Sequence, residues 1–361
     1  MNWLGFRDNP APTINYAGLR TWDNWAYSDD IADYGFLNWS TIHVAGGVFH
    51  WDVFDKRRAD LISQGKVGVY TFGGVPGWVA DQSAAFSSFV TAIVARAAGQ
   101  GFRIWELWNE PNAGANAISA ATAAAFAAIA YPIIKAADPD AVVLSPAPQG
   151  NGAGWFGDFL EAGGAAHYDV TALHLYCDTD PDALAAAGGL RAIMANYAAI
   201  LPDKPIWCSE FSEHGYWFDD LTPANNERDY IGQMLPQLWA LGVDRAYWYA
   251  WDGDVTGRLW TGAGSNRNVA GDAWNEVRSW MLGARRTSHI EWSGDVGVLN
   301  ISRTGYSAKI AWHYKGTSDL TIPAGVYTRY RDLAGNVTAI GGAATTAPLT
   351  NSAIIIETGA P

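Results

Sequence analysis

Cysteine and charged side chains are scarce in this chain. Only two of its 361 residues are cysteine and 16% are charged, whereas 49% are hydrophobic. Two cysteines cannot build a disulfide-dense scaffold, so a buried core must hold the fold together. The high apolar content excludes a disordered protein, and the length fits one large domain and a smaller one.

Positive charge is also in deficit, because 23 Lys and Arg residues face 36 Asp and Glu residues for a net charge of -13. Nucleic acids and anionic membranes need a basic face, so neither is an expected partner. No run of 18 apolar residues is present, and we expect no membrane insertion. The opening MNWLGFRDN lacks a basic and apolar leader. We expect a monomer that is secreted or periplasmic, its leader lying outside this sequence, with a cytoplasmic location left open.

Aromatic residues are abundant: 19 Trp, 16 Tyr and 13 Phe. Most of them must be core residues, because indole rings are large and bury well. Aromatic faces also stack on the C–H faces of sugar rings, so Trp-rich loops favour a carbohydrate cleft.

Up to residue 284, short β-rich runs alternate with amphipathic or Ala-rich helical stretches. Eight strands with intervening helices over this length predict a (β/α)8 barrel at 1–284. A doubly wound sheet is the alternative, but no Gly-rich phosphate loop follows an early strand. The predicted strands are 2–7, 17–22, 66–73, 102–109, 141–145, 169–176, 205–210 and 245–251, and the helices 53–64, 82–99, 118–137, 181–200, 223–241 and 271–283.

From residue 285 the pattern changes to short β runs separated by Gly, Asn, Ser and Pro turns. No helical periodicity remains, so 285–361 is predicted to be a small antiparallel β-sandwich that accompanies the barrel. In the predicted strands Cys208 points inward and Cys177 outward, so we expect both cysteines to stay as thiols.

Two carboxylates end predicted strands at a spacing that suggests joint chemistry. Glu110 lies in WELWNEPN, directly before Pro111, which stops a strand, and Glu210 ends KPIWCSE. The 100 residues between them equal three βα units of a barrel, which places strands four and seven across its mouth. Two carboxylates about 5 Å apart there suit double displacement at an anomeric carbon, with one as nucleophile and one as acid and base.

The surrounding residues suggest how the two carboxylates are supported. Arg20 is a candidate cation, and His174 and Tyr176 share the inward face of strand six. Tyr176 is placed to hydrogen-bond the nucleophile and His174 to line the sugar pocket. Asn109 is placed to donate to the sugar 2-hydroxyl, provided that the strand kinks at Pro111. Four tryptophans are candidate sugar platforms: Trp22, Trp78, Trp217 and Trp251.

Several plainer interpretations stay open. Arg20 also fits a structural salt bridge, His174 a buried core histidine, and Trp251 simple packing. Glu106 shares the inward face of Glu110 but lies deeper, which favours a buried ion pair. Glu213 is an alternative nucleophile, although its place in a loop argues against rigid positioning. Neither HExxH nor paired Cys-His spacing occurs, so no metal or cofactor is expected.

The motifs WNEPN, ALHLY, a strand ending Ser-Glu and YWYAW resemble glycoside hydrolase clan A. Within that clan, GLRTWDNW, WSTIHVAGGVFHWDVFD and YTFGGVPGW are similar to family 39, which includes bacterial exopolysaccharide endoglycosidases and β-xylosidases, the former being the closer match. The resemblance implies Glu110 as acid/base and Glu210 as nucleophile of a retaining enzyme that cleaves equatorial (β-type) bonds in a polysaccharide or oligosaccharide.

Endo cleavage is the preferred interpretation, and an exo-acting β-xylosidase or α-L-arabinofuranosidase is the alternative. A barrel that binds glycan without turnover is the alternative of a different class.

Overall fold

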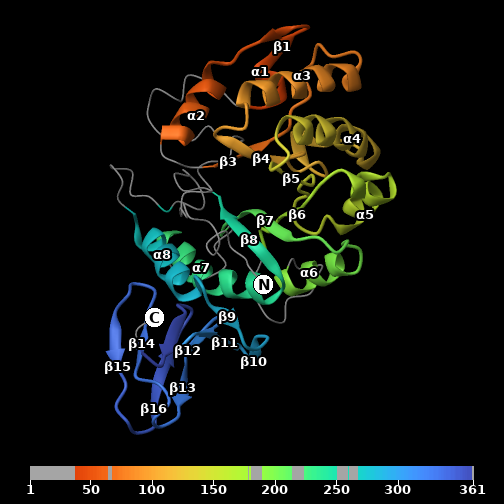
Figure 1. Ribbon diagram of the computed structural model, residues 1–361. Coiled ribbons are helices and arrows are strands. Elements are labelled where there is room, and N and C mark those ends of the chain that lie inside the picture. The colour runs from red at the N-terminus through yellow and green to blue at the C-terminus, as the bar shows by residue number, and fades with distance from the viewer. Residues whose placement is uncertain are drawn as a thin grey trace. The chain divides into compact units, whose positions relative to one another are not determined.

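The computed structural model describes residues 37–63, 67–177, 179, 189–213, 223–249, 259 and 267–359 (Figure 1). The chain divides into two compact units. One consists of Asn15–Leu175 and Ala195–Ser209, and the other of Met1–Ile14, Tyr176–Met194 and Glu210–Pro361. The strands predicted at 2–7 and 17–22 lie outside the described residues.

In the first unit strands and helices alternate as predicted. Strands β3, β4 and β5 are parallel neighbours in that order, and a bridge between Leu144 and Val170 leads on towards β6. The strands and helices predicted here are confirmed, with ends that differ by a few residues. The elements are α2 (Asp52–Ser63), β3 (Gly68–Thr71), α3 (Gln82–Ala97), β4 (Phe102–Glu106), α4 (Ala120–Ala137), β5 (Val142–Leu144), α5 (Ala153–Glu161) and β6 (Thr171–His174).

Helices α1 and α5 and strands β1 and β2 of this unit were not predicted. The connection at 23–50 contains α1 (Trp39–Ile42) and an antiparallel hairpin of β1 (His43–Ala45) and β2 (Val48–Phe49). These elements are too short to show a hydrophobic periodicity in the sequence. Helix α5 is nine residues long and follows a Gly-rich loop. Such short segments carry too few residues for periodicity to identify them.

Aromatic packing forms the core of the first unit. The ring centroids of Phe86 on α3 and Phe126 on α4 are 4.3 Å apart, and Phe126 also contacts Trp108, 5.4 Å away. All three side chains are buried. Because Trp108 directly follows β4, this core supports the segment that carries Glu110.

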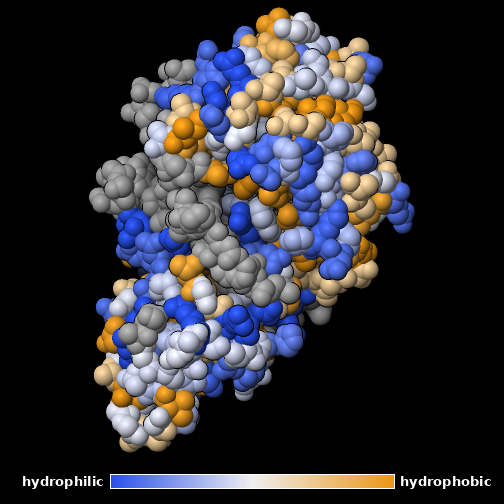
Figure 2. Space-filling view, in the orientation of Figure 1, coloured by the Kyte–Doolittle hydropathy of each residue, from blue (hydrophilic) through white to orange (hydrophobic). Residues whose placement is uncertain are grey.

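Helix α4 is the one helix among the described residues that is long and apolar enough to cross a membrane by length and composition. The buried core helix of a water-soluble protein meets the same test. Its inward face, with Phe126, Ala130 and Ile134, is buried. The surface in view in Figure 2 mixes hydrophilic and hydrophobic residues.

The remaining strands and helices also follow the α/β alternation. A second sheet has the order β6-β7-β8, and the division between the units falls inside β7, after Ser209. The elements are α6 (Leu190–Ala198), β7 (Ile206–Phe211), α7 (Pro223–Ala240), β8 (Val243–Trp248) and α8 (Val269–Met281).

The C-terminal part is an antiparallel sheet of seven strands with a two-stranded partner. The order is β10-β11-β12-β17-β14-β15, with β9 beside β11, and β13 pairs with β16. Val298, Ala311 and Ile354 are cross-strand partners that share one core with Ile322 and Leu349 of the small sheet. The short strands and their antiparallel pairing agree with the pattern predicted from residue 285 onward. The strands are β9 (Arg285–Arg286), β10 (Glu291–Ser293), β11 (Val296–Arg303), β12 (Tyr306–His313), β13 (Ser318–Ile322), β14 (Arg329–Arg331), β15 (Val337–Ala339), β16 (Thr345–Leu349) and β17 (Ile354–Glu357).

Helix α7 is joined to this sheet by a buried amide. The side-chain nitrogen of Gln233 donates to the carbonyl oxygens of Tyr314 (3.2 Å) and Asn351 (2.8 Å), and its oxygen accepts from the Thr179 hydroxyl at 3.0 Å. At Gly232 an added Cβ would lie 2.8 Å from a methyl carbon of Leu333, so glycine lets the two segments pack closely without moving that side chain. Helix α7 and the C-terminal sheet belong to the same compact unit, and these contacts hold them together.

A buried carboxylate ties three strands of the sheet together. Glu357 on β17 is fully buried and accepts hydrogen bonds from Arg329 (2.8 Å), Arg331 (2.7 Å) and the Tyr306 hydroxyl (2.5 Å). Burial alone would raise the pKa of Glu357, but the hydrogen bonds from Arg331 and Tyr306 and the arginine charges outweigh it and lower that pKa.

Replacing Glu357 with Gln should destabilise the chain by about 3 kcal/mol, because the partly buried guanidinium groups of Arg329 and Arg331 lose the buried carboxylate that they share. Since the folded-state pKa is depressed, the unfolded chain binds this proton first. The stabilisation is therefore complete above the ordinary pKa of about 4.3 and is lost as the pH falls from there through the folded pKa. Urea unfolding of native and variant chains at neutral and acidic pH measures both effects.

Asp319→Asn is the matched control, because Asp319 is exposed on β13. It should change the unfolding free energy little. If Glu357→Gln behaved like Asp319→Asn, the proposed role of the buried carboxylate would be wrong.

Candidate active site

Backbone hydrogen bonds on both sides hold the segment that follows β4. The N–H of Asn109 donates to the carbonyl of Phe72 after β3 (2.9 Å), and the N–H of Glu110 donates to Ala147 after β5 (3.0 Å). The Asn112 side chain exchanges two hydrogen bonds with the backbone of Gln149, at 2.9 and 3.1 Å. The WNEPN motif is therefore anchored to both neighbouring loops.

Glu110 adopts a left-handed backbone conformation, with φ of 44°. A side chain other than glycine rarely occupies this region, and the strain costs on the order of 1–3 kcal/mol. The expected kink is thus at Glu110 itself, one residue before Pro111. This turn resolves the parity conflict between Asn109 and Glu110, which strict strand alternation would place on opposite faces.

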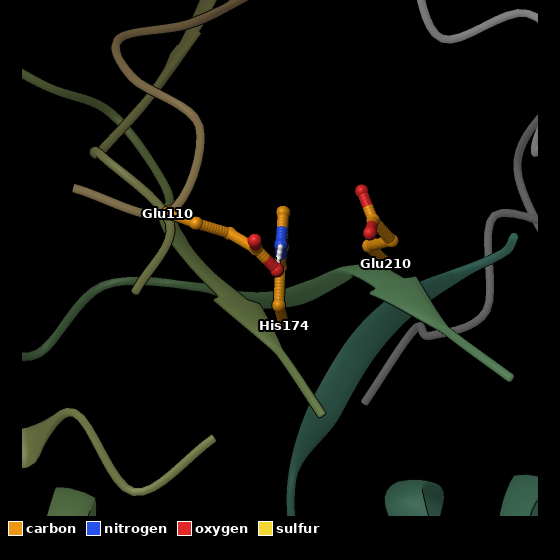
Figure 3. A group of neighbouring side chains, drawn as sticks. All are labelled: Glu110, His174 and Glu210. Atoms are coloured by element: carbon orange, nitrogen blue, oxygen red, sulfur yellow. Dashed lines mark hydrogen bonds and ion pairs between the residues drawn. The ribbon is translucent and has the colours of Figure 1, made fainter. Parts of the chain in front are cut away.

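His174 ends β6 and contacts the Glu110 carboxyl group. Its Nδ1 lies 3.1 Å from Glu110 Oε1, as the dashed line in Figure 3 marks. The imidazole is fully buried, whereas the carboxyl side chain keeps 22% of its surface exposed. The carboxyl group of Glu110 is therefore accessible to a ligand from solvent, while the buried His174 contacts this carboxyl group on its protein side.

Both ring nitrogens of His174 face carboxylates, because Nε2 lies 3.7 Å from Glu106 Oε1. An imidazole flanked in this way is suited to holding and passing a proton. Carboxylate and imidazole side chains are also among the groups that bind metal ions in proteins. Glu106 is buried, as predicted, and the pair that it makes with His174 is an ion pair when the imidazole is protonated.

In the other unit, Tyr176 and Glu210 contact each other. The Tyr176 hydroxyl, two residues beyond the end of β6, donates a hydrogen bond to Glu210 Oε1 on β7. The contact matches the one expected from strand parity. Glu210 is nearly buried, with 6% of its surface exposed, and Figure 3 draws it at the end of its strand.

Glu213 is held more firmly than the sequence suggested. It lies two residues beyond β7, yet only 3% of its surface is exposed, and the preceding Ser212 is fully buried. The expectation of a loosely held loop residue is therefore wrong, and Glu213 stays a rival of Glu210 that only experiment can separate.

Trp78 is the one predicted aromatic platform among the described residues. Its indole N–H donates to the carbonyl of His43 (2.9 Å), its ring meets the His43 ring edge-on at 4.7 Å, and 40% of its surface is exposed. Burial lowers the pKa of His43, whose Nδ1 accepts the Trp39 N–H at 3.2 Å. An indole whose N–H is hydrogen-bonded and whose surface is partly exposed to solvent is suited to stacking on a sugar ring.

The remaining predictions concern Asn109, the two cysteines and four residues that lie outside the described part of the chain. Asn109 is buried beside Glu110, and its role at a sugar hydroxyl stays a prediction. Both cysteines are buried and do not form a disulfide, as expected. Four candidate residues lie outside the described residues: Arg20, Trp22, Trp217 and Trp251.

Asn116 was not identified from the sequence. Its carbonyl accepts the indole N–H of Trp108 at 2.8 Å, and its side chain accepts the N–H of Gly74 at 3.2 Å. It thereby ties the loop after β3 to the loop after β4. No sequence signal marks it, because an asparagine in a loop is ordinary.

The model of the glycosyl hydrolase catalytic core family matches residues 66–269. No curated protein matches the chain. Among solved structures, the family 30 subfamily 8 xylanase Xyn30A from Clostridium acetobutylicum matches with a TM-score of 0.61 and 12% identity, over 86% of this chain and 85% of that chain.

Two family 39 structures match as well. The enzyme from Xanthomonas axonopodis pv. citri gives a TM-score of 0.56 at 17% identity, over 86% of this chain and 83% of that one. The β-xylosidase from Caulobacter crescentus gives 0.54 at 16%, over 87% and 84%. At these identities the solved structures show a shared fold.

The strain at Glu110 can be measured. Glycine normally destabilises a chain relative to alanine, but at a left-handed position the order reverses. Glu110→Gly should therefore be more stable than Glu110→Ala by about 1 kcal/mol in urea unfolding. Both variants lose the His174 contact, so their difference isolates the backbone.

Ala113 provides the control in the same loop, because its φ is -147°. There the glycine variant should be less stable than the native alanine. An Ala variant at 110 that equalled or exceeded the Gly variant would contradict the strained conformation.

Proposed function

Because the chain belongs to the glycosyl hydrolase catalytic core family, we propose that it is a retaining glycoside hydrolase with Glu110 as acid/base and Glu210 as nucleophile. The family match confirms the resemblance to glycoside hydrolases that the motifs indicated. Membership in family 39 and cleavage of equatorial, β-type bonds are parts of the proposal.

The observation that carries the proposal is the different support of the two carboxylates. Glu210 accepts a hydrogen bond from Tyr176, which holds its carboxyl group in the fixed orientation that a nucleophile needs. Glu110 instead faces an imidazole, a group that can share a proton with it, and it is partly exposed. Two carboxylates with opposite demands on protonation are what acid/base and nucleophile require.

The proposed architecture explains how the two groups meet. We place β4 and β7 opposite one another in a (β/α)8 barrel of residues 1–284, with residues 285–361 as an accessory β-sandwich. Active sites of such barrels lie at the C-terminal strand ends, where both carboxylates are found. In this arrangement the two carboxyl groups would be about 5–5.5 Å apart, the separation of retaining enzymes.

The reaction then proceeds in two displacements. The Glu210 carboxylate attacks the anomeric carbon while Glu110 gives its proton to the leaving oxygen, which yields an alcohol and a glycosyl ester on Glu210. Glu110, now a carboxylate, takes a proton from water as the water oxygen attacks the anomeric carbon and releases Glu210. One water is consumed, and both carboxyl groups return to their starting states.

Xylan is the first substrate to test, because the similar structures include a xylanase and a β-xylosidase. An exposed indole at Trp78 favours a polymer that spans several subsites, and hence endo cleavage. An exo-acting β-xylosidase or α-L-arabinofuranosidase is the second candidate. A polymeric substrate favours a secreted or periplasmic protein, since polysaccharides do not cross membranes. A panel of polysaccharides assayed for new reducing ends identifies the sugar, and product length separates endo from exo.

Glu210→Gln should lower kcat at least about 1,000-fold, because an amide cannot form the glycosyl ester. Glu213→Gln is the matched control, since it removes a buried carboxylate three residues away. It should keep most of the activity. Reducing-end assays on the substrate from the panel, with unfolding curves for each variant, measure both.

A native-like rate for Glu210→Gln combined with a large loss for Glu213→Gln would move the nucleophile to Glu213. Tight glycan binding without turnover by the native chain would support a binding barrel instead.

A further inference from the structure

A second carboxylate lies beneath Glu110 and is fully buried. Glu106, the last residue of β4, has no exposed surface. Its Oε1 accepts a hydrogen bond from the hydroxyl of Thr71 on β3 at 3.2 Å and lies 3.7 Å from His174 Nε2. Burying a carboxylate is costly unless its surroundings stabilise it, so the contacts with Thr71 and His174 matter to the fold.

These contacts decide which nitrogen of His174 carries hydrogen. Glu106 Oε1 acts as an acceptor towards Thr71, so a bare Nε2 would set lone pair against lone pair, whereas an N–H there is attracted. A buried negative charge strengthens that preference, because the local dielectric is low. Nε2 therefore bears hydrogen, and Nδ1 is left for the carboxyl group of Glu110.

The contact between Nδ1 and Glu110 then holds one proton. With Nε2 protonated, the 3.1 Å contact is attractive either when Glu110 is a carboxylic acid and Nδ1 accepts, or when the imidazole is charged and Glu110 is a carboxylate. In both states a single proton lies between the two atoms. That is the proton that the acid step delivers to the leaving oxygen.

We propose that Glu106 is a positioning residue: through His174 it holds the carboxyl group of Glu110 and keeps a proton available to it. This inference rests on the proposed role of Glu110 as acid/base. Glu106 does not touch the substrate and acts only through the histidine.

Two carboxyl groups of the same unit lie beside His174, that of Glu106 on the Nε2 side and that of Glu110 on the Nδ1 side. Replacing Glu106 with Gln removes a negative charge 3.7 Å from Nε2. The electrostatic environment of Nε2 therefore changes, while the contact at Nδ1 keeps both of its side chains.

Nitrogen-15 NMR of the full chain with labelled histidine tests the network directly. Nitrogens with and without hydrogen resonate far apart, and the signals that His174→Asn removes identify His174. The native chain should show hydrogen on Nε2. In Glu106→Gln the amide can donate to Nε2, so the bare form of Nε2 should appear.

A bare Nε2 in the native chain would overturn the proposal, and this readout needs no substrate and no change to Glu106. An unchanged His174 spectrum in a folded Glu106→Gln would overturn it as well. If Glu110→Gln and Glu210→Gln kept native activity, the proposed function would fail while the NMR result stood by itself.

Kinetics on aryl β-xylobiosides extends the test if the panel confirms a xylan-type substrate. Phenolate needs a proton to leave and dinitrophenolate does not. Glu106→Gln should therefore lower kcat/KM, which reports the step in which the phenol leaves, about 10- to 100-fold for the phenyl substrate and change it less than about 3-fold for the dinitrophenyl substrate. The basic limb of its pH profile should move to lower pH.

Asp169→Asn is the matched control. Asp169 pairs with Lys135 at 3.1 Å and lies at the start of β6, the opposite end from His174. It should lower stability without moving the pH profile. An equal loss on both substrates with an unmoved pH profile in Glu106→Gln would assign Glu106 a purely structural role.

Discussion

The left-handed turn at Glu110 is the constraint on which the candidate site depends. It is maintained because the loops after β3 and β5 bind the backbone of this segment from both sides, while the aromatic core packs beneath Trp108. The strain costs on the order of 1–3 kcal/mol, so this backbone conformation persists only because the well-packed residues around it hold it. In return, the carboxyl group of Glu110 contacts His174 at the end of β6.

Strand and helix periodicity predicted most of the described α/β elements, and strand parity predicted the contact between Tyr176 and Glu210. His174, predicted to line the sugar pocket, contacts Glu110. Parity identifies a face but names no partner, so the contact of Glu106 with His174 could not be predicted. The burial of Glu213 was missed because it depends on how the residues after β7 fold back. The hairpin at 43–49 is too short to show a period.

Buried polar groups recur wherever this chain joins its parts. Glu357 links β17 to its neighbours, Gln233 fastens α7 to the C-terminal sheet, and Glu106 lies behind the candidate acid. With only 16% charged residues, the chain places several of its carboxylates where each has hydrogen-bond donors. Such groups are costly to strip of a partner, so they specify geometry more than they add stability.

The central claim is that Glu110 and Glu210 act as a pair in a double displacement. Proton NMR of the sugar product during the first minutes of hydrolysis, before mutarotation, tests it most directly. The claim predicts that the first-formed product keeps the anomeric configuration of the substrate, since two inversions cancel. A product of inverted configuration would contradict it, because inversion proceeds by direct attack of water and needs carboxyl groups about 6.5–9.5 Å apart.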